Sequence, residues 1–245
     1  MLITTLQLSP VPARVLPALL ITVAFGLAAF LLRGVTVSGA LAGTFTAFLI
    51  YLGLGSGGFV TLLLVFVLTF VATRLGYRRK QQLGLAEQES GRDANQVLAN
   101  VAAAAVFAVL AIRNPAFAIA SVAAMAEAAA DTSQSEIGQL VSARAWMITT
   151  FRRVPAGTDG GITSTGTLAG AIAACIVALA AAAMHVIPPN LMWVAAFAGF
   201  LGTIVDSVLG ATLERAEWLN NDAVNFLSTA AAGAIALALA RFAIR

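Results

Sequence analysis

The sequence predicts an all-α fold, a polytopic membrane helix bundle of about eight transmembrane helices in a single domain covering residues 1–245. Only 10% of the residues are charged, whereas a soluble domain usually carries about 25%. Apolar residues make up 60% of the chain, and the mean hydropathy is +0.93. The apolar residues gather into runs of about the 20 residues that one helical span needs. This composition excludes a soluble globular enzyme.

Turn-forming residues separate the apolar runs. They fall at Arg33-Gly34, Gly55 to Gly58, Asn114-Pro115, Gly157 to Gly161 and Pro188-Pro189, where glycine and proline interrupt helices. Each run between these boundaries is long enough for one helix. The predicted spans cover residues 15–32, 35–54, 57–73, 95–112, 116–138, 162–185, 191–211 and 223–243.

The basic residues predict the orientation, because Lys and Arg in short loops stay on the cytoplasmic side of a membrane. Ten of the fourteen Lys and Arg residues fall in segments that eight spans would place on the same side of the membrane. We therefore expect a multi-pass protein of the cell inner membrane, with both termini outside and loops 74–94 and 139–161 in the cytoplasm. The ten residues are Arg33, Arg74, Arg78, Arg79, Lys80, Arg92, Arg144, Arg152, Arg153 and Arg215.

Two short similarities indicate an internal repeat with halves 1–114 and 115–245. Segment 38–43 (SGALAG) resembles segment 165–170 (TGTLAG) at an offset of 127 residues, and Asp93-Ala94 resembles Asp222-Ala223 at an offset of 129. Two halves of four spans each would be parallel repeats with a site between them. Alanine-rich helices also match one another by chance, so duplication and chance both stay open.

Four acidic residues interrupt the apolar spans, with Glu127, Asp131 and Glu136 in the fifth span and Asp206 in the seventh. A charge at the centre of a span costs roughly 2.5–3.5 kcal/mol on insertion scales, so such residues face the bundle interior or a wet cavity. Carboxylates beside Ser and Thr hydroxyls suit Mg²⁺, for which Asp131, Asp206 and Glu136 are the predicted ligands. The alternative is that these acids form structural ion pairs with arginines.

Two loop segments offer groups that could bind phosphate. Loop 157–167 is rich in glycine and hydroxyl residues and precedes the sixth span, so backbone N–H groups and a helix N-terminus could cradle an anion. It lacks the Walker A spacing, and Gly166-x-x-x-Gly170 is equally a helix-packing motif. Loop 74–93 carries Arg92 and the only lysine, Lys80, and amides open the fourth and eighth spans. The predicted nucleotide- and head-group-binding residues are Gly160, Gly161, Thr163, Thr167, Asn95, Gln96, Asn100, Ser207, Asp222 and Asn225.

Five motifs occur in order along the chain. They are GRDxxQVLAN at 91–100, ADTxxSEIG at 130–138, GTDGGIT at 157–163, VDSxLGATLE at 205–214 and NDxVN at 221–225. Together they resemble the integral membrane family first catalogued as domain of unknown function 92, over about residue 34 to the C-terminus. One departure is Asp159, where the family more often has asparagine.

The resemblance implies a kinase, because this family includes the chloroplast phytyl-phosphate kinase and is distantly related to CTP-using membrane enzymes. We therefore expect transfer of a phosphoryl group from CTP, or from GTP, UTP or ATP, to a polyprenyl or phytyl monophosphate. Lys80, Arg92 and Arg153 would clamp phosphate charge. The expected partners are the nucleotide, the lipid phosphate and the bilayer, without nucleic acid. A cytidylyltransferase acting on a lipid phosphate and a membrane transporter remain alternatives. The predicted catalytic residues are Asp131, Glu136, Asp206, Lys80 and Arg92.

Overall fold

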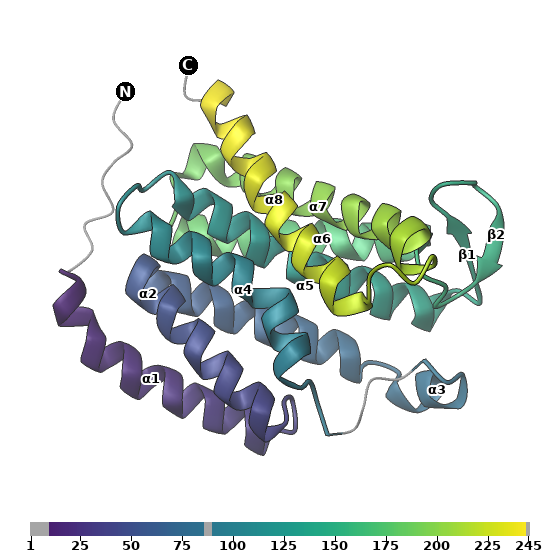
Figure 1. The fold of residues 1–245 in the computed structure, drawn as a ribbon, viewed down its shortest axis with the longest axis horizontal. Helices are drawn as coiled ribbons and strands as arrows, with labels where there is room; N and C mark the ends of the chain where they lie inside the picture. Colours follow the sequence, from purple (N-terminus) through teal and green to yellow (C-terminus); the bar gives the residue numbers. More distant parts are fainter. Residues whose placement is uncertain (1–9, 86–89, 244–245) are drawn as a thin grey trace.

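The computed structural model describes residues 10–85 and 90–243 of the chain. Helices dominate it, and one small sheet interrupts them (Figure 1). The elements are α1 (Val11–Leu31), α2 (Val37–Arg74), α3 (Tyr77–Gln82), α4 (Ala94–Ala111), α5 (Phe117–Val141), β1 (Arg144–Met147), β2 (Arg153–Pro155), β3 (Gly161–Ile162), α6 (Ser164–Ala183), η1 (Pro189–Leu191), α7 (Met192–Leu209), η2 (Gly210–Glu214) and α8 (Asn221–Ala243).

Helix α2 consists of two spans joined at Gly55. A straight helix of its 38 residues would be about 57 Å long at 1.5 Å per residue. However, Nη2 of Arg74, at its end, donates a 2.9 Å hydrogen bond to the carbonyl oxygen of Arg33, just before its start. Gly55 has φ 71° and ψ −165°, a conformation that glycine adopts without steric cost. The chain therefore folds back at Gly55, and the spans predicted at 35–54 and 57–73 are both present.

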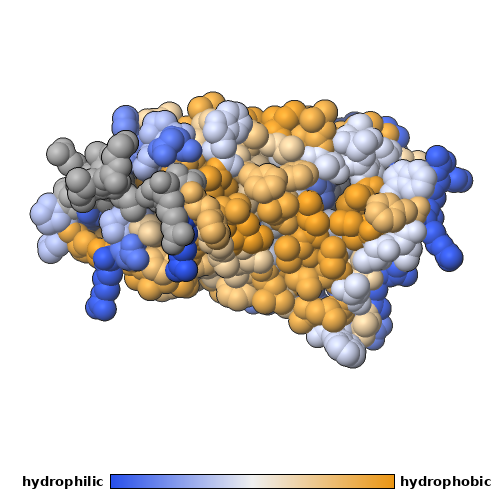
Figure 2. Space-filling model, turned by 90° about the horizontal axis from the view of Figure 1, so that it is seen from above, coloured by the Kyte–Doolittle hydropathy of each residue, from blue (hydrophilic) through white to orange (hydrophobic). Residues whose placement is uncertain are grey.

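The helices are long and apolar enough to embed the chain in a membrane. Among the described residues, six helical stretches meet the length and composition of a span, namely α1, α2, α4, α6, α8 and residues 189–214. Helix α5 coincides with the predicted span 116–138 but carries three acids and is not among the six. Figure 2 shows a broad apolar band across one face, with hydrophilic side chains at both ends. The predicted polytopic helical membrane fold is thus confirmed.

Helix α5 is the centre of the bundle and packs against α2, α4, α6, α7 and α8. Its residues 118–130 are all buried. A Cβ added to Gly170 of α6 would lie 3.0 Å from the carbonyl oxygen of Ala130, and one on Gly199 of α7 would lie 2.8 Å from Cβ of Ala126. Small residues allow membrane helices to approach this closely. The neighbouring helices therefore hold the polar C-terminal half of α5 in place.

One end of the bundle carries α3 and the small sheet (Figure 1). Strand β1 pairs antiparallel with both β2 and β3, in the order β2-β1-β3, within the connection between α5 and α6. The sequence did not predict this sheet, because strands of two to four residues are too short to show an alternating pattern. That this end faces the cytoplasm stays a prediction.

Helix caps recur at a constant spacing along the chain. Thr36 at the start of α2 and Thr163 at the start of α6 each accept a hydrogen bond from the backbone N–H three residues on. Asp93 does the same for α4, and Asn220 for α8. Both pairs are 127 residues apart, so Asp93 aligns with Asn220 rather than with Asp222. The duplication itself stays a prediction.

Candidate active site

A polar cavity of about 280 Å³ lies at the end of the bundle that carries the sheet. Its walls come from the C-terminal half of α5, the end of α7 with η2, the starts of α4 and α8, and the connection that leads into α6. Eleven of the sixteen predicted site residues line it, which are Arg92, Gln96, Asn100, Asp131, Glu136, Gly160, Gly161, Thr163, Asp206, Ser207 and Asn225.

Helix α5 and the start of α4 form one wall of the cavity. Nη2 of Arg92 donates a hydrogen bond of 3.2 Å to Oγ1 of Thr132. The backbone next to Arg92 is held by a capping box, in which Asp93 accepts from the N–H of Gln96 and the Gln96 side chain accepts from the N–H of Asp93. The guanidinium group of Arg92 is therefore held at the edge of the cavity. It bonds Thr132, which follows Asp131 on α5.

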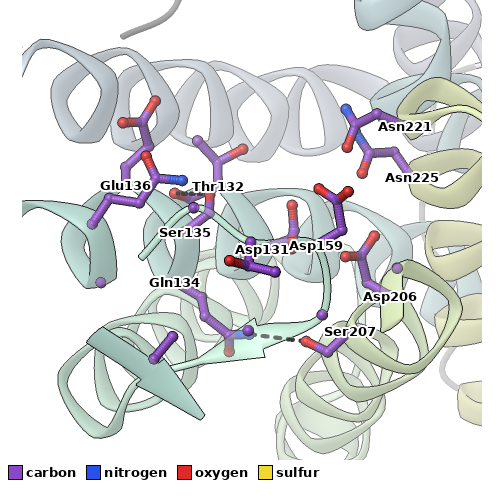
Figure 3. Close-up of a pocket in the computed structure, with 18 of the residues that line it drawn as sticks. Asp131, Thr132, Gln134, Ser135, Glu136, Asp159, Asp206, Ser207, Asn221 and Asn225 are labelled. Atoms are coloured by element: carbon purple, nitrogen blue, oxygen red, sulfur yellow. Dashed lines mark hydrogen bonds between the residues drawn. The ribbon is translucent and has the colours of Figure 1, made fainter. Parts of the chain in front are cut away.

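Acidic side chains from three elements converge in the cavity. Figure 3 shows Asp131, Asp159 and Asp206 around a common space, with Glu136 on the other side of the view. The Oδ2 atom of Asp206 is buried and has no hydrogen-bond partner among the described residues. Its charge is repelled by Asp131 and by Glu214. Carboxylates placed this closely need a cation nearby when they are ionised.

The end of α7 widens into a π-helical turn, η2, as it reaches the cavity. Turns of this kind are rare and occur frequently at functional sites. Gly210 begins the turn, and a Cβ added to it would lie 3.0 Å from the backbone nitrogen of Gly160. The absence of a side chain at Gly210 therefore lets η2 contact the glycine loop, residues 157–163, directly.

The glycine loop forms a tight turn that uses one of its own N–H groups within the protein. Gly160 has φ 73°, and a Cβ added to it would lie 2.6 Å from Cα of Ala211, so both its conformation and its space require glycine. The N–H of Gly161 donates to the carbonyl oxygen of Thr158 over 2.8 Å, and the N–H of Ile148 donates to that of Gly160 over 3.0 Å. The N–H of Gly161 is therefore already bonded within the protein.

Amide side chains complete the walls. Gln134 of α5 donates from Nε2 to Oγ of Ser207 over 3.5 Å (Figure 3). Thr203 of α7 donates to Oε1 of Gln134 over 3.4 Å. This bridge ties α5 to α7 on the side of the cavity that holds Asp206. Asn221 and Asn225 of α8 also line the cavity.

Five of the predicted site residues do not line the cavity: Lys80, Asn95, Arg153, Thr167 and Asp222. Arg153 is exposed on β2, with its guanidinium carbon 5.0 Å from the ring centroid of Trp146, so the predicted phosphate clamp does not include it. Lys80 is buried behind Glu136, and its Nζ donates to Oε2 of Glu136 over 2.5 Å. The same Nζ donates to the carbonyl oxygens of residues 72 and 73 at the end of α2. The ammonium group is thus engaged by protein oxygens. Asn95 is exposed, and Thr167 lies one helical turn beyond Thr163.

The oxygen donors of the cavity fit a magnesium ion bound by two carboxylates. The described residues contain no group of three or more His, Cys, Asp or Glu side chains placed to hold a metal ion. The predicted set of Asp131, Asp206 and Glu136 is therefore not assembled, because Glu136 is bonded to Lys80 instead. Magnesium usually keeps several waters and takes one or two carboxylates with substrate phosphates. Asp131 and Asp206 supply such a pair, and Ser207 also lines the cavity.

The cavity also contains residues that were not among the predicted ligands and binding residues. Ser135, Glu214 and Asn221 belong to the five sequence motifs, so a signal for them existed. Asp159 was noticed only as a departure from the family. Gln134 gave no signal, because its contacts with α7 depend on how two distant segments pack. These residues are Gln134, Ser135, Asp159, Glu214 and Asn221.

The fold and this cavity define the class of the protein, a polytopic helical membrane protein with an acid- and amide-lined site at one end of the bundle. The chain belongs to the family described as integral membrane protein DUF92, whose model matches residues 20–233. The membership that the five motifs predicted is thereby confirmed.

Relatives occur in plants, cyanobacteria and archaea. Protein VTE6, chloroplastic, of Arabidopsis thaliana is 30% identical over 226 residues, which are 88% of this chain and 68% of that protein. An uncharacterized membrane protein of Synechocystis sp. is 32% identical over 198 residues, 78% of this chain and 77% of the relative. An uncharacterized membrane protein of Methanocaldococcus jannaschii is 35% identical over 177 residues, which are 72% of this chain and 73% of the relative. No solved structure matches the chain.

Proposed function

We propose that this protein is a magnesium-dependent kinase. It transfers the terminal phosphoryl group of a nucleoside triphosphate, with CTP as the main candidate, to an isoprenoid monophosphate such as phytyl phosphate. The observation that carries the proposal is the pair Asp131 and Asp206 in a polar cavity beside Arg92, with one buried oxygen of Asp206 lacking a partner among the described residues. Phosphoryl transfer requires positioned charges more than covalent chemistry by the protein. The resemblance to a family that includes a phytyl-phosphate kinase supplies the substrate class.

The proposed reaction needs no general base. A phosphate monoester carries an ionised oxygen at neutral pH, and this oxygen attacks the terminal phosphorus of the nucleotide. The bond between that phosphorus and the bridging oxygen breaks, and the nucleoside diphosphate leaves with the electron pair. The products are a lipid diphosphate and a nucleoside diphosphate. The protein must therefore orient two phosphate groups and offset their charge.

The cavity residues divide into three roles under this proposal. Asp131 and Asp206 would hold magnesium, which supplies neutralisation of the nucleotide phosphates when it is bound. Arg92, fixed against α5, would hold the acceptor phosphate through its forked N–H groups. Asn225 and Gln96 would orient the ribose, the base or the head group. Lys80 and Glu136 would act by positioning α5 against α2 rather than by touching phosphate.

Product analysis tests the proposal. Purified protein is incubated with magnesium, phytyl or geranylgeranyl phosphate, and CTP, GTP, UTP or ATP in turn, and the products are identified by mass spectrometry. We expect the lipid diphosphate together with a nucleoside diphosphate. A cytidylyl-lipid with released pyrophosphate would instead identify a cytidylyltransferase. No turnover with any lipid phosphate would overturn the kinase proposal and favour a transporter.

A further inference from the structure

A second cavity of about 110 Å³ lies beside the polar one, between α1, both halves of α2 and α4. Its walls are mostly apolar, and Phe25 and Phe66 meet edge to face there with their ring centroids 5.3 Å apart. Arg92 and Asn100 line both cavities. The apolar cavity therefore meets the polar one at the start of α4, where Arg92 is bonded to α5.

Gly43 leaves the interior of this apolar cavity open. A Cβ added to Gly43 would have only one neighbour within 4 Å, Cγ1 of Val97 at 3.9 Å. Gly39, one helical turn earlier, is different, because a Cβ there would clash with the carbonyl group of Arg92. Gly39 thus serves close packing, whereas Gly43 borders free space. The two glycines, one helical turn apart, therefore have different roles.

Cationic groups gather where the apolar cavity approaches the polar end of the bundle. Arg33 and Arg74 line it together with Arg92. The guanidinium carbon of Arg74 lies 5.3 Å from the ring centroid of Phe70, and Nη2 of Arg74 donates to the carbonyl oxygen of Arg33. From Arg33, just after the end of α1, the lining continues along α1 from Ala29 to Phe25, four residues or about 6 Å deeper. An apolar channel with cations at one end suits a ligand with an anionic head and a hydrocarbon tail.

We propose that this cavity binds the isoprenoid chain of the lipid phosphate whose head group enters the polar cavity beside Arg92 and Asn100. The inference rests on the proposed function for the identity of the head group, and it adds where the tail lies and where its distal part has room. Burial of the chain against Phe25, Phe66 and the small residues of α2 would remove apolar surface from water at the cavity mouth. Gly43 would leave room for the distal part of the chain.

Chain-length selectivity tests the position of the tail. We measure kcat/KM for geranylgeranyl phosphate and for dimethylallyl phosphate, and we take their ratio. Gly43→Leu should lower this ratio at least tenfold, because the added side chain fills the space of the longer tail. Gly43→Ala should lower it by less. Leu41→Phe is the matched control, because Leu41 lies on the same helix but is 70% exposed, and its ratio should not change.

Photolabelling locates the tail without relying on turnover. Geranylgeranyl phosphate with a diazirine at the distal end of its chain is irradiated with the wild-type protein, and the labelled peptides are sequenced. We expect labels on α1, α2 or α4 near Phe25, Gly43 and Val97, and competition by unlabelled geranylgeranyl phosphate. Labels confined to other helices, or labelling competed only by bulk phospholipid, would overturn the inference.

The two measurements separate this inference from the proposed function. Labelling in the cavity without turnover would retain the tail site and overturn the kinase. Turnover in the wild-type protein with an unchanged ratio in Gly43→Leu would retain the kinase and overturn the tail site. If Gly43→Leu does not fold, the wild-type labelling pattern and the ratio for Gly43→Ala still decide the question.

Discussion

Lys80, the only lysine of the chain, is buried and donates a 2.5 Å hydrogen bond from Nζ to Oε2 of Glu136 on α5. The same ammonium group caps the end of α2 through the carbonyl oxygens of Ala72 and Thr73. It therefore joins α2, α3 and α5 just behind the polar cavity. Glu136 faces the cavity on one side and Lys80 on the other, so the pair holds the cavity wall in place.

Removing only Lys80 should destabilise the protein strongly. Lys80→Met leaves the Glu136 carboxylate buried without its partner, and breaking a buried pair in this way costs about 3–5 kcal/mol. The double variant Lys80→Met/Glu136→Gln should recover most of the loss. Thermal unfolding in detergent measures both, and Arg79→Met, at an exposed neighbour, is the control. A Lys80→Met protein that unfolds at the wild-type temperature would show that the pair contributes little.

Removing the charge of Asp206 should slow turnover strongly and leave the fold intact. Asp206→Asn removes a proposed magnesium ligand, and loss of a group that stabilises transition-state charge costs about 10²–10³-fold in rate. Stability should not fall, because the substitution also removes repulsion from Asp131 and Glu214. The assay compares kcat, the unfolding temperature and magnesium titrations with those of Glu217→Gln, at an exposed position outside the cavity. Full activity of Asp206→Asn at saturating magnesium would refute the metal assignment.

The spans and the main acids could be predicted because each depends on one continuous segment. A run of apolar residues shows its length directly, and an acid such as Asp131 or Asp206 stands out within it. The turn at Gly55 was visible for the same reason, as a glycine cluster between two runs. Local composition therefore predicted the eight helical segments and showed that α5 and α7 carry the acids of the site.

Pairings between distant segments could not be predicted in this way. Lys80 and Glu136 are 56 residues apart, and only the packing of α2 and α3 against α5 shows that Lys80 bonds an acid instead of facing the cavity. Gln134 and Ser207 are 73 residues apart, and their contact depends on the crossing of α5 and α7. The residue types were informative, but their partners are set by tertiary structure.

Arg92 should affect the binding of the lipid phosphate more than the binding of the nucleotide, because it lines both cavities. Arg92→Lys keeps the charge but loses the planar fork that bonds Thr132 and could hold a phosphate. We expect KM for the lipid phosphate to rise about tenfold or more, with a smaller change in KM for CTP. Steady-state kinetics with each substrate varied in turn measures this, and Arg78→Lys, at an exposed position, is the control. A larger rise in KM for CTP than for the lipid phosphate would place Arg92 at the nucleotide instead, and equal rises would contradict a selective role at the acceptor.

Replacement by alanine should be more harmful at Gly160 than at Gly84, a glycine with a similar backbone conformation. Gly160 has φ 73° and Gly84 has φ 71°, so alanine meets a left-handed conformation at both positions, at a cost of about 1–2 kcal/mol. Only at Gly160 would the new Cβ also press on the backbone of Ala211, because nothing lies within 4 Å of the corresponding position at Gly84.

The difference between Gly160→Ala and Gly84→Ala therefore isolates the contact between the glycine loop and η2. We expect Gly160→Ala to have the lower unfolding temperature and a raised KM for CTP, since the loop must move away from η2 and from the cavity. Gly84→Ala should keep the wild-type KM. Thermal unfolding and nucleotide kinetics on the two variants measure this, and equal effects would mean that the loop shifts freely and that its contact with η2 does not shape the cavity.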